Sequence, residues 1–150
     1  TKLLDSSGLK FKFRSDLKLP SIEDDIYVAD TMGETGLFYK LSDICIMGGT
    51  FCDTGGHNII EPAHYACKLF YGPEMFNFIN ICEDFHAKKA SHQVQNKDQL
   101  IEVLIQALKN ETDEFDKMAI EAQKLAKEKA NIIDDILKDI SPFIDEVVKV

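Results

Sequence analysis

Residues 48–62 place glycine pairs, a threonine, an asparagine and a glutamate within one short segment. The segment reads Gly-Gly-Thr-Phe-Cys-Asp-Thr-Gly-Gly-His-Asn-Ile-Ile-Glu-Pro and follows the apolar run 44–47. The apolar run predicts a buried strand, and the pattern from Asn58 predicts a helix. The free N–H groups and the dipole of a helix N-terminus favour an anion, most often a phosphate. No Gly-Lys-Ser/Thr closes the loop, so it is not a Walker P-loop.

Two glutamates follow possible helix caps by three positions, in Thr31-Met32-Gly33-Glu34 and Asn58-Ile59-Ile60-Glu61. In one interpretation each is a capping box, or for Asn58 a near relative, and the Glu reaches back to the backbone N–H of its cap. In the other, the carboxylate accepts hydrogen bonds from ribose hydroxyls, as acidic residues do in dinucleotide-binding folds. The two interpretations are compatible. Gly48-Gly49-Thr50 likewise allows either a tight turn or a set of ligand donors.

Four short apolar runs predict strands, and two periodic segments between them predict helices. The strands are expected at 10–13, 26–29, 44–47 and 68–71, and the helices at 33–41 and 58–66. This alternation predicts an α/β fold with a parallel sheet and helices packed on its faces. Ligands of such sheets bind beyond the carboxyl ends of the strands, where both glutamate segments fall.

The last third, residues 97–150, is expected to be a helical tail within the same domain. Leu100, Leu104 and Leu108 are predicted to share one helix face. A second helix follows residues 110–112, and Pro142 interrupts the last helical stretch. A length of 150 residues fits a single domain.

Charge and composition exclude several classes of protein. The formal net charge of −9 argues against a nucleic-acid surface and against direct adsorption to anionic lipid. No apolar run approaches the roughly 20 residues of a membrane span. The four cysteines contain no Cys-x-x-Cys pair; Cys45 and Cys67 are expected to be reduced core residues, which fits a cytosolic compartment. His57 and His64 have no partner at ligand spacing, and no metal or other cofactor is expected.

Four motifs in order carry a family resemblance. They are Asp30-Thr31-Met32-Gly33-Glu34, Gly48-Gly49-Thr50, Gly55-Gly56-His57-Asn58-x-x-Glu61-Pro62 and Gly72-Pro73-x-x-Phe76-Asn77-Phe78. Together they resemble the C-terminal half of the 3-deoxy-D-manno-octulosonic acid (Kdo) transferases of lipopolysaccharide synthesis, from about Phe11 to Phe85. The departures are Ile59 and Lys68, where that family often has proline, and Thr35 in place of a usual leucine.

The resemblance implies a Rossmann-like domain of a two-domain GT-B glycosyltransferase, in which this half binds the donor CMP-Kdo. By motif matching, Met32, Gly33 and Glu34 form one CMP-contacting segment. Asn58, Ile59, Ile60 and Glu61 form the other, with a helix N-terminus at the phosphate and Glu61 at the ribose.

The resemblance also implies that the catalytic base and the lipid A acceptor site lie in a missing N-terminal half. This chain is then expected to hold no catalytic residue, to be inactive alone, and to touch the membrane only through that half. The fragment is expected to be soluble, and the whole enzyme to act at the cytoplasmic side of the bacterial inner membrane. The start without Met fits a piece of a longer protein.

Two alternatives remain open at this point. One is a GT-B transferase or epimerase that uses a UDP-sugar. The other is a non-catalytic nucleotide-binding or interaction module whose acidic tail is a partner surface.

Overall fold

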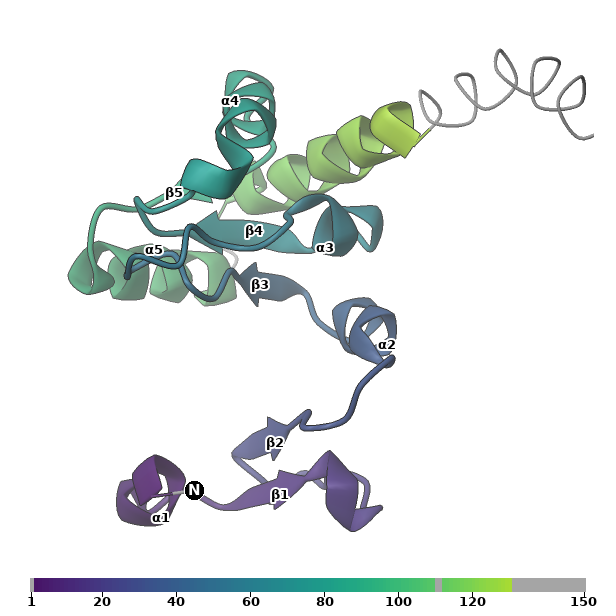
Figure 1. The fold of residues 1–150 in the computed structure, drawn as a ribbon, viewed down its shortest axis with the longest axis vertical. Helices are drawn as coiled ribbons and strands as arrows, with labels where there is room; N and C mark the ends of the chain where they lie inside the picture. Colours follow the sequence, from purple (N-terminus) through teal and green to yellow (C-terminus); the bar gives the residue numbers. More distant parts are fainter. Residues whose placement is uncertain (1, 110–111, 131–150) are drawn as a thin grey trace, which may run out of the picture. The chain divides into compact units, whose positions relative to one another are not determined.

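The structure, a computed structural model, describes residues 2–109 and 112–130. The chain divides into two compact units, residues 1–38 and 39–150, and each is described by itself (Figure 1). The expectation that residues 1–150 form a single nucleotide-sugar-binding domain stays a prediction. The predicted helical stretch interrupted by Pro142 lies outside the described residues.

The first unit is built around two short parallel strands. Its elements are α1 (Lys2–Ser7), β1 (Phe11–Phe13), the 3-10 turn η1 (Arg14–Asp16), β2 (Ile26–Val28) and the start of α2 (Thr35–Lys40). Phe11 pairs with Ile26 and Phe13 with Val28. Both predicted strands and the predicted helix at 33–41 are confirmed, each slightly shorter than expected.

The second unit contains a three-stranded parallel sheet in the order β3-β4-β5. Its elements are β3 (Ile44–Ile46), α3 (Ile60–His64), β4 (Lys68–Tyr71), η2 (Phe76–Phe78), α4 (Ile79–Ala87), β5 (His92–Gln93) and α5 (Lys97–Lys109). A further helix occupies residues 114–130. Strands β3 and β4 confirm the prediction, whereas α1, α4 and β5 are elements that the sequence analysis did not predict.

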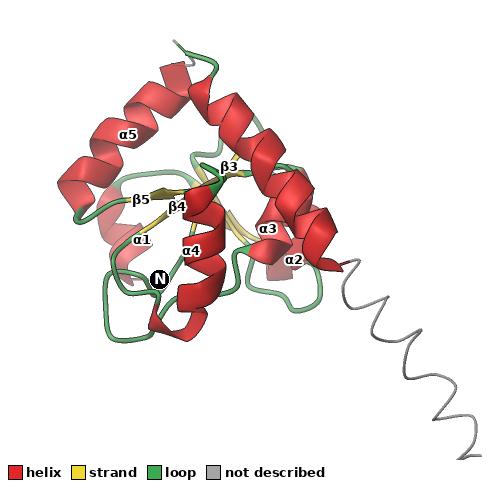
Figure 2. Ribbon diagram, turned by 90° about the horizontal axis from the view of Figure 1, so that it is seen from above, coloured by secondary structure: helices red, strands yellow, loops and turns green. Residues whose placement is uncertain are grey.

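Helices cover both faces of this sheet (Figures 1 and 2). Successive side chains of a strand point to opposite faces, and β4 shows this alternation. Leu69 and Tyr71 belong to a buried cluster with residues of α3, α4 and helix 114–130, and Phe70 to a second cluster with residues of α5. The central strand is thus buried on both sides, as expected of a parallel sheet between helices.

Helix 114–130 lies close to the first cluster because its buried positions there are small. Ala122 and Ala126 are fully buried. Polar contacts hold the helix at both ends: Lys68 pairs with Asp116 (2.7 Å), and Lys129 pairs with Asp84 of α4 (2.5 Å). The helix therefore fastens the start of β4 and the outside of α4 to one another.

The predicted face of α5 is only partly right. Val103 and Ala107 are the buried residues of this helix, and Leu100 and Leu104 are partly buried beside them. Leu108 is 73% exposed. Positions four apart advance about 40° around a helix, so the third member of an i, i+4, i+8 series leaves the buried face.

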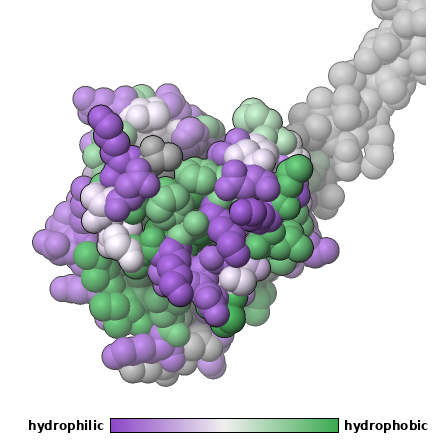
Figure 3. Space-filling view, turned by 90° about the horizontal axis from the view of Figure 1, so that it is seen from below, coloured by the Kyte–Doolittle hydropathy of each residue, from purple (hydrophilic) through white to green (hydrophobic). Residues whose placement is uncertain are grey.

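The observed architecture confirms the predicted fold class, parallel strands in sheets flanked by helices. Hydrophobic patches lie among hydrophilic ones on the face shown in Figure 3. Within the described residues, no helix combines the length and apolar character that a membrane crossing requires.

All four cysteines are free thiols, and Cys67 is buried with its sulfur against the carbonyl oxygens of Tyr39 and Ser42.

Candidate functional site

Thr50 fastens the loop after β3 to the loop after β4. Its hydroxyl donates to the Met47 carbonyl (2.9 Å) and accepts from the Gly72 N–H (2.9 Å). Its own carbonyl accepts from the Glu74 N–H (3.0 Å). Thr50 is fully buried, so its hydroxyl is already satisfied inside the protein. The structure therefore supports the tight-turn interpretation of Gly48-Gly49-Thr50, and it gives the hydroxyl no exposure to a ligand.

The second glycine pair, Gly55-Gly56, allows the two loops to approach closely. Both residues have positive φ values, +81° and +74°. A Cβ atom on Gly56 would lie 2.2 Å from the Met75 sulfur, and one on Gly55 would lie 2.5 Å from the Phe76 ring. These glycines are required for loop packing, in addition to any role beside a ligand.

Asn58 stabilises the entry to α3 with its side chain. Its Oδ1 accepts from the Ile60 N–H (3.0 Å), whereas Ile59 occupies the N-cap position. The predicted box, in which Glu61 reaches back to the backbone N–H of Asn58, does not form, because the helix begins later than expected. Ile59 is fully buried and belongs to the cluster that contains Leu69 and Tyr71.

Glu61 is exposed in the first turn of α3. Its carboxylate makes no hydrogen bond or ion pair to any part of the chain that the structure describes. Burial is the main cause that raises the pKa of Tyr39, and nearby charged groups, Glu61 among them, raise it further. Glu61 is therefore a carboxylate with unoccupied acceptor positions beside a helix start.

Glu34 lies in the other unit and is held by an arginine that the sequence analysis did not single out. Arg14 donates from Nε to Glu34 Oε2 (3.0 Å) and from Nη2 to Oε1 (2.6 Å). The Thr31 hydroxyl also donates to Oε2 (2.5 Å). The predicted capping box is wrong here, because the Glu34 carbonyl itself accepts from the Leu37 N–H at the start of α2. The carboxylate is consequently free to bind Arg14.

The two residues before Glu34 are open to a ligand. Met32 is 97% exposed. Gly33 has φ +83°, and a Cβ atom built on it meets no atom within 4 Å. The seven predicted CMP-contacting residues thus fall into two sets, 32–34 in the first unit and 58–61 in the second, and their role stays a prediction.

The ion pair predicts how the first unit responds to acid. The hydrogen bonds of Arg14 and then of Thr31 lower the pKa of Glu34 from 4.5 to about 2. A carboxyl group with a depressed folded pKa stabilises the fold above its unfolded pKa, and this stabilisation is lost as the pH falls. We expect the loss for Glu34 to run from about pH 4.5 to about pH 2. A ¹³C NMR titration of the Glu34 carboxyl in the folded chain measures the lowered pKa on which this loss depends. A midpoint near 4.5 would contradict the pairing.

A hollow of about 320 Å³ opens at the carboxyl ends of β4 and β5. Its lining includes Tyr71, Met75, Phe76, His86 and Gln93. Burial raises the pKa of Tyr71 to about 12. Tyr71 and His86 were not predicted as lining residues, because β4 and α4 bring them together only in the folded chain.

The fold defines a class: the arrangement of parallel strands and helices is that of the C-terminal domain of a GT-B glycosyltransferase. A solved structure of the C-terminal CMP-Kdo binding domain of WaaA from Acinetobacter baumannii is similar with a TM-score of 0.76 and 29% identity. The match covers 82% of this chain and 64% of that one.

Proteins named 3-deoxy-D-manno-octulosonic acid transferase match most of the chain. The protein from Rickettsia bellii is 32% identical over 87% of the chain and 31% of its own length. The one from Haemophilus influenzae is 26% identical over 97% of the chain and 34% of its own length. The chain is thus a homologue of the Kdo transferases, which confirms the resemblance predicted from the motifs. It spans about a third of the length of these relatives, and no family model matches it.

Proposed function

We propose that this chain is the donor-binding part of a glycosyltransferase that moves Kdo from CMP-Kdo to a lipid A precursor. The observation that carries the proposal is the likeness to a CMP-Kdo binding domain at 29% identity over 82% of the chain. The order of the four motifs supports it, because three of them follow the carboxyl ends of β2, β3 and β4, and nucleotides bind at such ends in α/β sheets.

In the proposed reaction a hydroxyl oxygen of the acceptor attacks the anomeric carbon of Kdo. The bond between that carbon and the CMP phosphate oxygen breaks, and the electron pair leaves with the phosphate. A base takes the hydroxyl proton, and we place that base and the acceptor site in a part of the enzyme outside this chain. The same outside part would contact the inner membrane on its cytoplasmic side.

The contribution of this chain is to bind the nucleotide and to stabilise the leaving phosphate. Charge stabilisation by N–H groups suits CMP, which leaves as a stable anion. From the motif resemblance, we assign residues Met32–Gly33 and Asn58–Ile60 to contacts with CMP, and the Glu61 carboxylate to the ribose. Glu61 is favoured over Glu34 for the ribose because its acceptor positions are unoccupied among the described residues. The proposal requires neither a metal nor another cofactor.

Calorimetric titration of the 150-residue chain with CMP, UMP and UDP tests the function. We expect CMP to bind and both uridine nucleotides to bind at least tenfold more weakly. Preferential binding of UDP would replace the proposal with a UDP-sugar enzyme. Absence of heat with every nucleotide at millimolar concentration would overturn it.

A Glu61→Gln variant is expected to bind CMP about tenfold more weakly, with unfolding unchanged. Hydrogen bonds to a charged group are worth about 1.5–3 kcal/mol, and glutamine keeps the shape but loses the charge. The matched control is Glu102→Gln on α5, also an exposed helical glutamate, which is expected to bind CMP as the parent does. Equal affinities of all three proteins would remove Glu61 from the site.

A further inference from the structure

Two side-chain anchors tie the segment 30–34 to the turn that follows β1. Arg14 holds Glu34 through two hydrogen bonds of 3.0 and 2.6 Å. Ser15 holds Asp30 through two more, from its N–H to Oδ1 (2.9 Å) and from its hydroxyl to Oδ2 (2.6 Å). Each anchor is a two-point contact, which fixes the orientation of the groups as well as their separation.

The parallel register of the first unit makes this pairing possible. Phe13 is the partner of Val28, so the residues that follow each strand emerge side by side at the carboxyl edge. The anchors lie on either side of Met32 and Gly33. Met32 is exposed, and a Cβ atom built on Gly33 would meet no atom within 4 Å. The chain is therefore held at both ends of an open dipeptide.

The hydrogen bonds of Glu34 leave it poorly suited to bind a ribose. Oε1 accepts from Arg14, and Oε2 accepts from both Arg14 and Thr31. A ribose hydroxyl at this carboxylate would compete with a charged, two-point partner that is already in place. The carboxylate is placed instead to hold the arginine.

We propose that Arg14 and Ser15 are positioning residues that hold Met32–Gly33 in the conformation that contacts the nucleotide, and that Glu34 acts by binding Arg14. This inference rests on the proposed function. It differs from the ribose interpretation of Glu34 in one consequence: the loss of either partner of the ion pair has the same effect on nucleotide binding.

A double-mutant cycle of Arg14→Ala and Glu34→Ala, titrated with CMP and with 2′-deoxy-CMP, tests the proposal. We expect each single variant to bind CMP about fivefold to tenfold more weakly, and the double variant to bind no worse than either. All three are expected to keep the parent's ratio of CMP to 2′-deoxy-CMP affinity. Ser15→Ala is expected to weaken binding by a smaller factor of about three.

The ribose interpretation of Glu34 gives a different pattern. Glu34→Ala would then remove the preference for CMP over its 2′-deoxy form, whereas Arg14→Ala would leave a free carboxylate and full binding. Either of these results would overturn the proposal. Arg14→Lys keeps the charge but lacks the planar two-point contact, so it is expected to recover only part of the affinity and also serves if Arg14→Ala does not fold.

The matched control is Asp24→Ala, which breaks the Lys12–Asp24 ion pair (2.7 Å) in the same unit. Lys12 lies on β1, and Asp24 precedes β2 and also accepts two hydrogen bonds from Ser21; neither bonds residues 30–34 within the described chain. The control is expected to lower stability and to leave CMP affinity within twofold of the parent. A loss equal to that of Arg14→Ala would show that both effects are general weakening of the unit, and would overturn the positioning role.

Backbone ¹⁵N relaxation of the ligand-free chain separates this proposal from the proposed function. We expect the order parameters of Met32 and Gly33 to fall from about 0.85 to below about 0.6 in Arg14→Ala or Arg14→Lys, and to stay unchanged in Asp24→Ala. If the parent binds no nucleotide, the proposed function fails while this measurement still decides the positioning role. Unchanged order parameters in both Arg14 variants would overturn it.

Discussion

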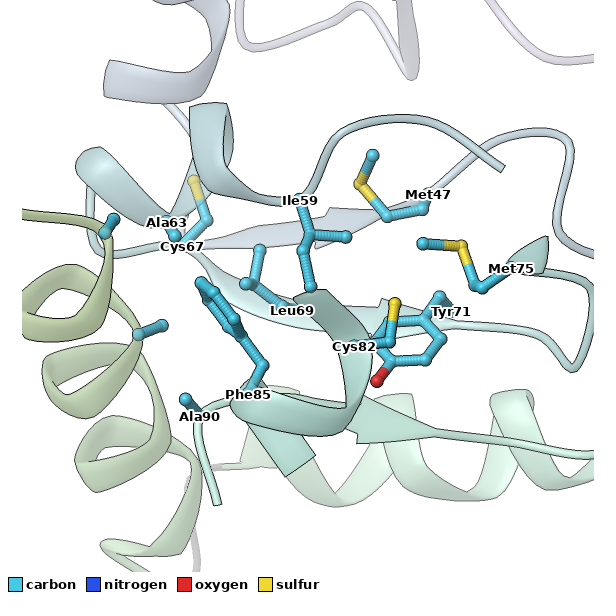
Figure 4. Packing of buried hydrophobic residues seen from close by; sticks show 12 residues of the cluster. Met47, Ile59, Ala63, Cys67, Leu69, Tyr71, Met75, Cys82, Phe85 and Ala90 are labelled. Atoms are coloured by element: carbon cyan, nitrogen blue, oxygen red, sulfur yellow. The ribbon is translucent and has the colours of Figure 1, made fainter. Parts of the chain in front are cut away.

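A Phe85→Ala variant is expected to unfold with a free energy about 3–5 kcal/mol below that of the parent chain. Phe85 of α4 is fully buried in the larger cluster, where it meets residues of β4 and of helix 114–130 (Figure 4). Two members of that cluster, Ala90 and Ala122, are too small to fill the space that the ring would leave. The variant therefore loses both the burial of the ring and the contacts around the cavity.

Urea unfolding followed by circular dichroism measures this loss as a lower midpoint at an unchanged slope. A domain of this size is stable by only about 5–15 kcal/mol, so the change is a large fraction of the total. The control is Ile120→Ala on helix 114–130, whose side chain is 63% exposed and should change the free energy by less than about 1 kcal/mol. If Phe85→Ala were as mild as that control, α4 would not pack as described.

The strands were predictable because their apolar runs are local features of the sequence. The run at 68–71 became β4 at the predicted residues, and its two-sided burial follows from its continuous apolar character. In contrast, β5 has only two residues, His92 and Gln93, and neither forms an apolar pattern. It is a strand because β4 offers it a parallel partner, which is a tertiary cause.

The candidate site also contains one feature that local sequence predicts and one that depends on the fold. Asn58 was predicted as a cap from its residue type, and its side chain does accept a backbone N–H at the entry to α3. The partner of Glu34 could not be predicted, because Arg14 precedes it by 20 residues and reaches it only through the register of β1 with β2. Local spacing suggested a capping box, but the carboxylate binds Arg14, a charged partner in the turn that follows β1.

The glycine-rich loop after β3 shows a third case. Its sequence allowed either a tight turn or a set of ligand donors, and Gly55 and Gly56 bring the backbone close to another loop of the same chain. Both uses need the same conformational freedom, so sequence alone does not distinguish them. The residue that reveals the difference is Thr50, whose hydroxyl is buried between the two loops.

Replacing Thr50 with valine is consequently expected to cost about 2–3 kcal/mol of unfolding free energy. Valine has nearly the same shape, so packing is kept while both hydrogen bonds of the hydroxyl are lost. The Gly72 N–H and the Met47 carbonyl are buried, and each would lose the partner that the hydroxyl provides. The penalty arises from these unsatisfied groups, because the unfolded chain can bond both to water.

Thr50→Ser separates the hydrogen bonds from the methyl group. Serine keeps the hydroxyl and should cost only about 1 kcal/mol, the value of one buried methyl group. Thr54→Val is the control on the exposed side of the same loop and should change the free energy by less than about 0.5 kcal/mol. Urea unfolding of the three variants gives the order of their stabilities, and a serine variant as unstable as the valine variant would contradict it.

Because Thr50 joins the loops on either side of the proposed nucleotide segment, the valine variant is also expected to bind CMP more weakly. The serine variant should bind CMP as the parent does.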